Sequence, residues 1–149
     1  MIAHTPTVLL VEDDPDDARL VQRAFSRSGV PVSVLRLQNG DEAVSYLRGE
    51  APYDNRVLHP MPEVVLLDIK LPRRSGFEVL QWVRTQTDAL RRIPVVMLTS
   101  STHSTDIDRA YDLGANSYVS KPESTDQLNE LVLLFTMYWL KTNQPPAIA

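Results

Sequence analysis

The chain has 149 residues, no cysteine, a formal net charge of −4 and 43% hydrophobic residues. This length predicts a single domain with a substantial core, and the lack of cysteine excludes a disulfide framework, thiol catalysis and a cysteine-based zinc site. The acidic balance argues against a nucleic-acid-binding surface, and the absence of any apolar run of about 18 residues argues against a membrane span.

Apolar runs alternate with amphipathic stretches along the chain, a pattern that predicts βαβ units and a parallel sheet. Strands are expected at 7–12, 32–37, 63–68, 94–99 and 117–120. Helices are expected from Pro15 to just before Gly29, then at 41–48, 75–87, 104–113 and 123–141. We expect one domain over 1–149, with its core at 7–141, a proline-containing loop at 50–62, a flexible tail at 142–149 and no output domain.

Asp14 has two candidate roles at the start of the first helix. Directly before Pro15, it has the position of an N-cap residue, because proline is favoured as the first helical residue. Asp16 and Asp17 would then lie in the first turn, where negative charge is favourable. Asp14 could instead compete as a metal ligand, but its place before proline favours capping.

Polar side chains follow four of the apolar strands, and they are Glu12, Asp13, Asp68, Thr99 and Lys121. In a parallel α/β sheet the carboxyl ends of the strands share one edge, where ligands bind. We therefore expect these five side chains to converge, although they are far apart in the chain.

The three carboxylates in this group need a cation or a proton. At an effective dielectric constant of about 20, two like charges about 4 Å apart repel by roughly 4 kcal/mol. A small site of oxygen ligands suits Mg²⁺ together with a phosphate. Lys121 and Thr99 can each bind a phosphoryl oxygen, which leaves Asp68 as a carboxylate nucleophile that would form an acyl phosphate.

The chain resembles the receiver domain of two-component response regulators over about residues 7–140. The motifs that carry the resemblance are VEDDP (11–15), LLDIKLPRRSG (66–76), MLTSS (97–101) and LGANSYVSKP (113–122). Together they are highly specific, whereas any one alone would be weak. The resemblance implies a CheY-like, flavodoxin-like (βα)5 fold, which is a doubly wound parallel sheet of strand order 2-1-3-4-5.

The resemblance also implies the role of each metal and phosphate residue. Glu12 and Asp13 look like the acidic metal pair, and Asp68 looks like the phosphoacceptor that also binds the metal. The backbone carbonyl of Lys70 looks like a further metal ligand, and Mg²⁺ is the implied cofactor. Glu12 stands where aspartate is frequent in the family, a variant that keeps the charge.

Further residues match the family's conformational switch. Thr99 looks like the switch hydroxyl, Tyr118 like the switch aromatic and Lys121 like the lysine that pairs with the phosphate. In the family the peptide bond that corresponds to Lys121–Pro122 is usually cis. Lys70 and Ser101 occupy positions that tune dephosphorylation in the family.

A narrower resemblance indicates a partner. The loop at 50–62, the segment DIKLPRRSG and the long last helix are similar to single-domain regulators that partner cyanobacterial phytochrome kinases. The resemblance therefore implies a sensor histidine kinase, here a phytochrome, as the phosphoryl donor.

The last helix carries apolar residues on two faces. One stripe should pack on the sheet, and it contains Leu128, Leu131, Val132, Phe135, Tyr138 and Trp139. Leu133, Met137 and Leu140 are expected on the opposite face, which predicts a homodimer or partner interface. The alternative is that these three are scattered surface residues.

These features favour a signalling phosphoacceptor that catalyses only its own phosphorylation and dephosphorylation. The alternative is a receiver-fold interaction module that works without phosphorylation. A phosphatase of the haloacid dehalogenase type would need an acid where Lys70 stands, and a flavodoxin would not carry acids after its first strand. No segment remains for a DNA-binding helix-turn-helix, and the N-terminus lacks a signal-peptide pattern, so we expect a cytoplasmic protein.

Overall fold

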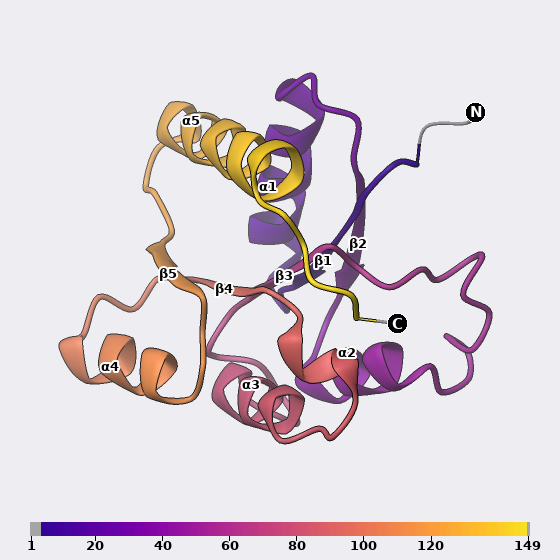
Figure 1. Ribbon diagram of the computed structural model, residues 1–149. Coiled ribbons are helices and arrows are strands. Elements are labelled where there is room, and N and C mark those ends of the chain that lie inside the picture. The colour runs from indigo at the N-terminus through magenta and orange to yellow at the C-terminus, as the bar shows by residue number, and fades with distance from the viewer. Residues whose placement is uncertain (1–3, 149) are drawn as a thin grey trace.

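The computed structural model describes residues 4–148 and contains one parallel sheet (Figure 1). Its strands, in the spatial order β2-β1-β3-β4-β5, confirm the predicted topology. They are β1 (Thr7–Val11), β2 (Ser33–Leu37), β3 (Val64–Leu67), β4 (Val95–Thr99) and β5 (Ser117–Ser120). Within these residues, no helix has both the length and the apolar character needed to cross a membrane.

Helices cover both faces of the sheet (Figure 1). They are α1 (Pro15–Arg27), α2 (Gly40–Arg48), α3 (Gly76–Arg84), α4 (Ser104–Asp112) and α5 (Thr125–Thr136). A short 3₁₀ helix, η1 (Ala89–Arg92), precedes β4, and a π-helical segment, η2 (Met137–Thr142), continues α5. Helices α1 and α5 pack against one apolar cluster of the sheet, and α2 and α3 pack against the other.

The central strands explain why the sheet needs this double cover. Every residue of β1, β3 and β4 is buried, so these strands are apolar on both faces. Side chains alternate between the two clusters, as Leu9 and Val11 enter one while Val8 and Leu10 enter the other. This double burial leaves the ends of the strands, and not their faces, for polar function.

The first helix starts as its sequence predicts. The Asp14 side chain accepts hydrogen bonds from the backbone N–H groups of Asp16 at 2.8 Å and Asp17 at 3.3 Å. Asp14 is therefore the N-cap, which decides between the two roles considered for it. Helix α3 begins with a capping box of Ser75 and Glu78 and ends at Arg84, before the predicted position 87.

The C-terminal helix departs from the predicted pattern because its last turn is a π-helix. The Asn143 N–H donates to the carbonyl of Tyr138, five residues earlier, which is the backbone spacing of a π-helix, and the Thr142 side-chain hydroxyl donates to the carbonyl of Met137. The wider turn changes which residues face the core. Leu140, expected outside, is partly buried against the sheet, and Tyr138, expected inside, is 51% exposed. Both expectations were wrong.

The C-terminal segment lies against the domain instead of extending away from it as a tail. The Arg92 guanidinium donates to the carbonyl of Ala147 at 2.9 Å. Ile148 packs against the apolar cluster that α2 and α3 cover. The flexibility expected of residues 142–149 stays a prediction, and these two contacts show where the segment lies as far as residue 148.

Candidate functional site

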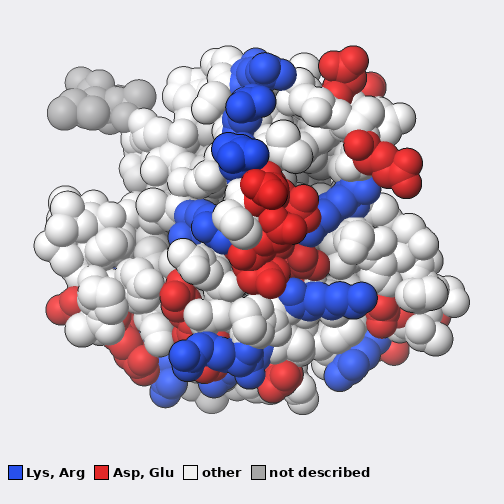
Figure 2. Space-filling model, turned by 180° about the vertical axis from the view of Figure 1, so that it is seen from behind, with Lys and Arg blue, Asp and Glu red and all other residues white. Residues whose placement is uncertain are grey.

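The carboxyl edge of the sheet brings the predicted carboxylates together. Glu12 and Asp13 directly follow β1, and Asp68 directly follows β3. One carboxylate oxygen from each of the three lies within 4.8 Å of the others. On the face seen in Figure 2, acidic side chains gather in one patch bordered by Lys and Arg.

Lys121 neutralises part of this cluster. Its Nζ atom lies 2.9 Å from Asp68 Oδ2 and 3.1 Å from Asp17 Oδ2, and it also contacts the Glu12 carboxylate. Asp17, in the first turn of α1, was missed as a site residue because an acid at a helix start already has a reason to be there. One ammonium group is thus shared among three carboxylates.

Burial and the contacts between Glu12, Lys121 and Asp68 together shift the pKa values of Glu12 and Lys121. Burial raises the pKa of Glu12 to about 7, although the hydrogen bond to Lys121 opposes this shift. For Lys121, burial acts to lower the pKa, but the hydrogen bonds to Glu12 and Asp68 outweigh it and raise the pKa above its ordinary value. Lys121 therefore stays positively charged, but its single charge does not neutralise all of the carboxylates around it.

The donor set fits a small divalent cation. Glu12, Asp13 and Asp68 offer only carboxylate oxygens, the ligand type that Mg²⁺ prefers. Asp13 is exposed, so that waters could complete an octahedral shell. Lys70 comes two residues after Asp68 and is exposed, and the metal-binding role of its backbone carbonyl stays a prediction from the resemblance to receiver domains.

The Asp68 carboxylate is held in a defined orientation. Its Oδ1 atom accepts a hydrogen bond from the Ile69 N–H at 2.7 Å, and its Oδ2 atom accepts one from Lys121. The side chain is 9% exposed, which keeps it near the surface but sheltered from bulk water. This geometry places a partly desolvated carboxylate at the end of β3.

Thr99 and Tyr118 meet at one loop. Thr99 is buried at the end of β4, and its hydroxyl accepts a weak hydrogen bond from the Ser101 N–H at 3.5 Å. The Tyr118 hydroxyl donates to the carbonyl of Ser101 at 2.9 Å, and burial raises the pKa of Tyr118. Ser101 Oγ also donates to Asp106 of α4 at 2.6 Å. Asp106 was not singled out from the sequence, because nothing local marks it as a partner of this loop.

The expected cis bond before Pro122 is wrong in this structure. Among the described residues the cis peptide bond is Ala51–Pro52, in the loop at 50–62, and Lys121–Pro122 is not cis. Trans is the favoured isomer of a prolyl peptide bond by about 0.5–1 kcal/mol, so it needs no special contact.

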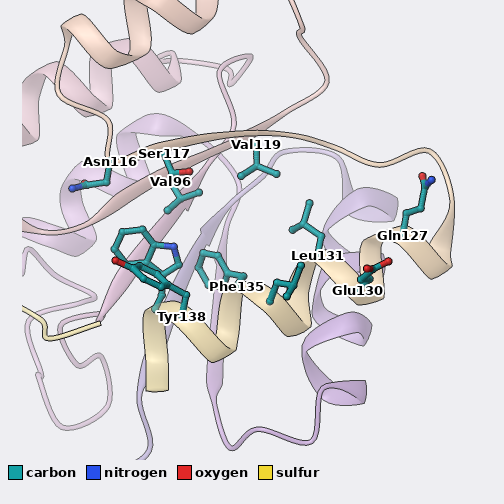
Figure 3. A pocket seen from close by; sticks show the side chains of 11 residues that line it. Val96, Asn116, Ser117, Val119, Gln127, Glu130, Leu131, Phe135 and Tyr138 are labelled. Atoms are coloured by element: carbon teal, nitrogen blue, oxygen red, sulfur yellow. The ribbon is translucent and has the colours of Figure 1, made fainter. Parts of the chain in front are cut away.

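A second surface feature adjoins α5. A pocket of about 610 Å³ lies between the outer strands and α5, and the aromatic side chains of Phe135, Tyr138 and Trp139 line it (Figure 3). Leu131 and Leu134 extend the apolar lining along the helix. The exposed apolar residues beside it are Leu133, Leu134, Met137 and Tyr138, at 42%, 64%, 49% and 51%. The apolar outer surface predicted for this helix is present. It differs from the prediction in that it includes Leu134 and Tyr138 and does not include Leu140, which packs on the core.

Comparison with known proteins identifies relatives of the whole domain. The family model for the response regulator receiver domain matches residues 8–133. Response regulator Rcp1 of Synechocystis sp. is 36% identical over 140 residues, which cover 94% of this chain and 92% of that protein. The probable methanogenesis regulatory protein FilR2 of Methanothrix harundinacea is 40% identical over 147 residues, covering 95% and 88%.

Two solved structures are similar in both sequence and fold. The phosphorylated cyanobacterial phytochrome response regulator RcpA superposes with a TM-score of 0.88 at 38% identity, covering 97% of this chain and all of that one. The Mn²⁺-bound form of Rcp1 gives a TM-score of 0.85 at 35% identity, covering 95% and 99%.

Proposed function

The chain belongs to the response regulator receiver domain family of signalling proteins, and on this basis we propose that it is a phosphorylation-controlled switch. A sensor histidine kinase would donate a phosphoryl group to Asp68 in a Mg²⁺-dependent reaction. The observation that carries the proposal is the shared contact of Lys121 with Asp68 and Glu12 at the carboxyl edge of the sheet. This cation would pair with a phosphoryl oxygen once the group is transferred.

Each site residue has a part in the transfer. An Asp68 carboxylate oxygen forms the new bond to phosphorus, while the bond from phosphorus to the donor breaks and its electrons leave with the donor group. Lys121 and the Thr99 hydroxyl stabilise charge on the transferring oxygens. Glu12, Asp13, Asp68 and the Lys70 backbone carbonyl would hold Mg²⁺, which supplies further positive charge when bound.

Phosphorylation would reach the surface through the loop after β4. A phosphoryl oxygen that binds the Thr99 hydroxyl competes with the weak hydrogen bond from Ser101. Ser101 also binds Tyr118 and Asp106, so its movement would shift the start of α4 and the outer face of β5. A local change of charge would thus bias the conformation of a docking surface.

The relatives support a phytochrome as the kinase. RcpA is described as a cyanobacterial phytochrome response regulator, and another similar structure, at 28% identity and a TM-score of 0.90, is a response regulator in red light signalling of R. palustris. The similarity to these two structures covers 97% and 95% of this chain. We therefore assign a phytochrome-type histidine kinase as the donor.

Incubation with acetyl phosphate tests the proposed chemistry. We expect intact-mass measurement to find one phosphoryl adduct on the wild type in the presence of Mg²⁺ and none in its absence. Asp68→Asn should carry no adduct in either condition, because an amide cannot act as the nucleophile. A folded wild type without an adduct would contradict the proposal and favour an interaction module that works without phosphorylation.

We also propose that the protein forms a homodimer through the outer surface of α5 and η2. A surface helix needs only one apolar face, whereas this one exposes Leu133, Leu134 and Met137 beside an apolar pocket. Leu140 is no longer part of the face because it packs on the core.

Light scattering of a double variant tests the dimer. Leu133→Glu with Met137→Glu should give a folded monomer, because two charges would be buried unpaired in the interface. The matched control is Val57→Glu with Leu58→Glu, which changes two exposed apolar residues in the loop at 50–62 and should leave the dimer intact. If the variant with Leu133→Glu and Met137→Glu remains dimeric, the outer surface of α5 and η2 is excluded as the dimer interface.

A further inference from the structure

Arg36 binds the backbone of both residues of the acidic pair. It lies on β2, directly opposite Leu10 of β1, and its side chain reaches beyond the end of β1. Its Nε atom donates to the carbonyl of Glu12 at 3.0 Å, and its Nη2 atom donates to the carbonyl of Asp13 at 3.0 Å. One guanidinium group therefore holds two consecutive peptide planes at the start of the loop between β1 and α1.

These two bonds fix the backbone from which the two carboxylates extend. The direction of a side chain follows from the peptide planes on either side of its Cα atom, and here the planes after Glu12 and Asp13 are both bound. A third bond, from the Glu12 N–H to the carbonyl of Leu37 at 3.0 Å, also ties the loop to β2. The Glu12 carboxylate is further held by Lys121.

Asp13 depends on the backbone more than Glu12 does. Its side chain is exposed, and within residues 4–148 its carboxylate has no ion pair or hydrogen bond with another residue. The bond from Arg36 to its carbonyl therefore holds the backbone of Asp13, and with it the position of the Cα atom from which the carboxylate extends. A preorganised carboxylate binds a metal more tightly than a mobile one, because less conformational freedom is lost on binding.

The charge of Arg36 acts in the opposite direction. A fixed cation beside a metal site repels Mg²⁺, so a purely electrostatic view predicts that Arg36 weakens binding. This repulsion is screened by solvent, since the Nη2 contact is on the exposed side of the site. Lysine would preserve the charge but not the planar fork that binds two carbonyls at once. The two effects can therefore be separated by substitution.

We infer that Arg36 is a positioning residue that prearranges Glu12 and Asp13 for Mg²⁺, an inference that rests on the proposed function. The guanidinium group acts through the backbone of the metal pair and does not itself touch the metal or the phosphoryl group. Outer-shell partners of metal ligands typically contribute about 10- to 100-fold to metal affinity. We expect the lower end of that range, because Lys121 still holds Glu12 when Arg36 is replaced.

Isothermal titration calorimetry of Mg²⁺ against wild type, Arg36→Met and Arg36→Lys tests the inference without a phosphoryl donor. Both variants should bind about 10-fold more weakly than the wild type, because both lose the bidentate contact. Arg23→Met is the matched control, since Arg23 is an exposed arginine of α1 without a hydrogen bond or ion pair within residues 4–148, and it should bind as the wild type does.

A kinetic readout separates positioning from loss of the fold. In phosphorylation by acetyl phosphate, the Mg²⁺ concentration at half-maximal rate should rise for Arg36→Met, while the rate at saturating Mg²⁺ should match the wild type. Thermal unfolding without metal should show that Arg36→Lys remains folded at the assay temperature.

The remaining outcomes would overturn the inference. Tighter binding by Arg36→Met with unchanged binding by Arg36→Lys would show that only charge matters. Equal Mg²⁺ affinity of the wild type, Arg36→Met and Arg36→Lys would overturn the positioning role of Arg36 but leave the proposed function standing. A wild type that binds no Mg²⁺ would overturn both this inference and the proposed function.

Discussion

Lys121→Met is expected to slow phosphorylation of Asp68 by acetyl phosphate by about 10²- to 10³-fold, the usual effect of removing one preorganised charge-stabilising group. The ammonium group lies 2.9 Å from Asp68 Oδ2, where it would meet an oxygen of the incoming phosphoryl group. Methionine matches the lysine side chain as far as Cε, but it lacks the terminal ammonium group and so cannot donate a hydrogen bond or carry charge. The rate of adduct formation at saturating Mg²⁺, measured by intact mass, checks this.

The same substitution should destabilise the metal-free protein by about 2 kcal/mol, less than a fully buried broken ion pair costs. Lys121 is 16% exposed, and Glu12 has a pKa of about 7, so that Glu12 can take up a proton and relieve part of the repulsion. Saturating Mg²⁺ should recover most of the loss, because the ion binds only the folded site.

Lys141→Met is the matched control for both effects, because Lys141 is an exposed lysine on η2. It should leave the phosphorylation rate and the stability unchanged. A Lys121→Met rate within about threefold of the wild type would mean that the lysine does not contact the transferring group.

Gly76→Ala is expected to lower the free energy of unfolding by about 3 kcal/mol, the upper part of the usual range for overpacking. A Cβ atom at Gly76 would lie 2.0 Å from the backbone oxygen of Asp68 and 2.9 Å from the Cα atom of Ile69. Neither atom belongs to a flexible side chain, so α3 and the end of β3 would have to separate. Thermal unfolding should show a fall in Tm of roughly 6–12 °C for a chain of this size.

The displaced backbone would also move Asp68. The Gly76 N–H donates to the carbonyl of Ile69 at 2.8 Å, and the Ile69 N–H donates to the Asp68 carboxylate. Strain at Gly76 is therefore transmitted to the orientation of the phosphoacceptor, and we expect slower adduct formation even where the variant is folded.

Gly29→Ala provides the contrast. Gly29 has a φ of +74° and no neighbouring atom within 4 Å of a Cβ, so alanine there meets only backbone strain, which costs about 1–2 kcal/mol. It lies after α1, away from Asp68, and should leave phosphorylation unchanged. A Gly76→Ala protein as stable as Gly29→Ala, with a wild-type phosphorylation rate, would contradict the steric explanation.

The end of the chain illustrates the limit of pattern analysis. An α-helical period of 3.6 residues placed Tyr138 on the core face and Leu140 outside, and the structure reverses both. The change arises at the π-helical turn, where the Asn143 N–H donates to the carbonyl of Tyr138, five positions earlier in the chain. No local residue type marks such a turn, so an α-helical period carried through 137–142 assigns the wrong face to these residues.

The sequence by itself determined the order of the strands and helices, the N-cap at Asp14 and the polar residues at the strand ends. These features depend on residues that are close together in the chain. The central strands are apolar runs that can be buried on both faces of the sheet, and the cap forms hydrogen bonds with the first turn of its own helix. Only the tertiary structure placed Asp17 on Lys121 and Arg36 on the carbonyls of Glu12 and Asp13. Those contacts join residues that lie 104, 24 and 23 positions apart, and their distances depend on how the strands and α1 pack together, which no local pattern encodes.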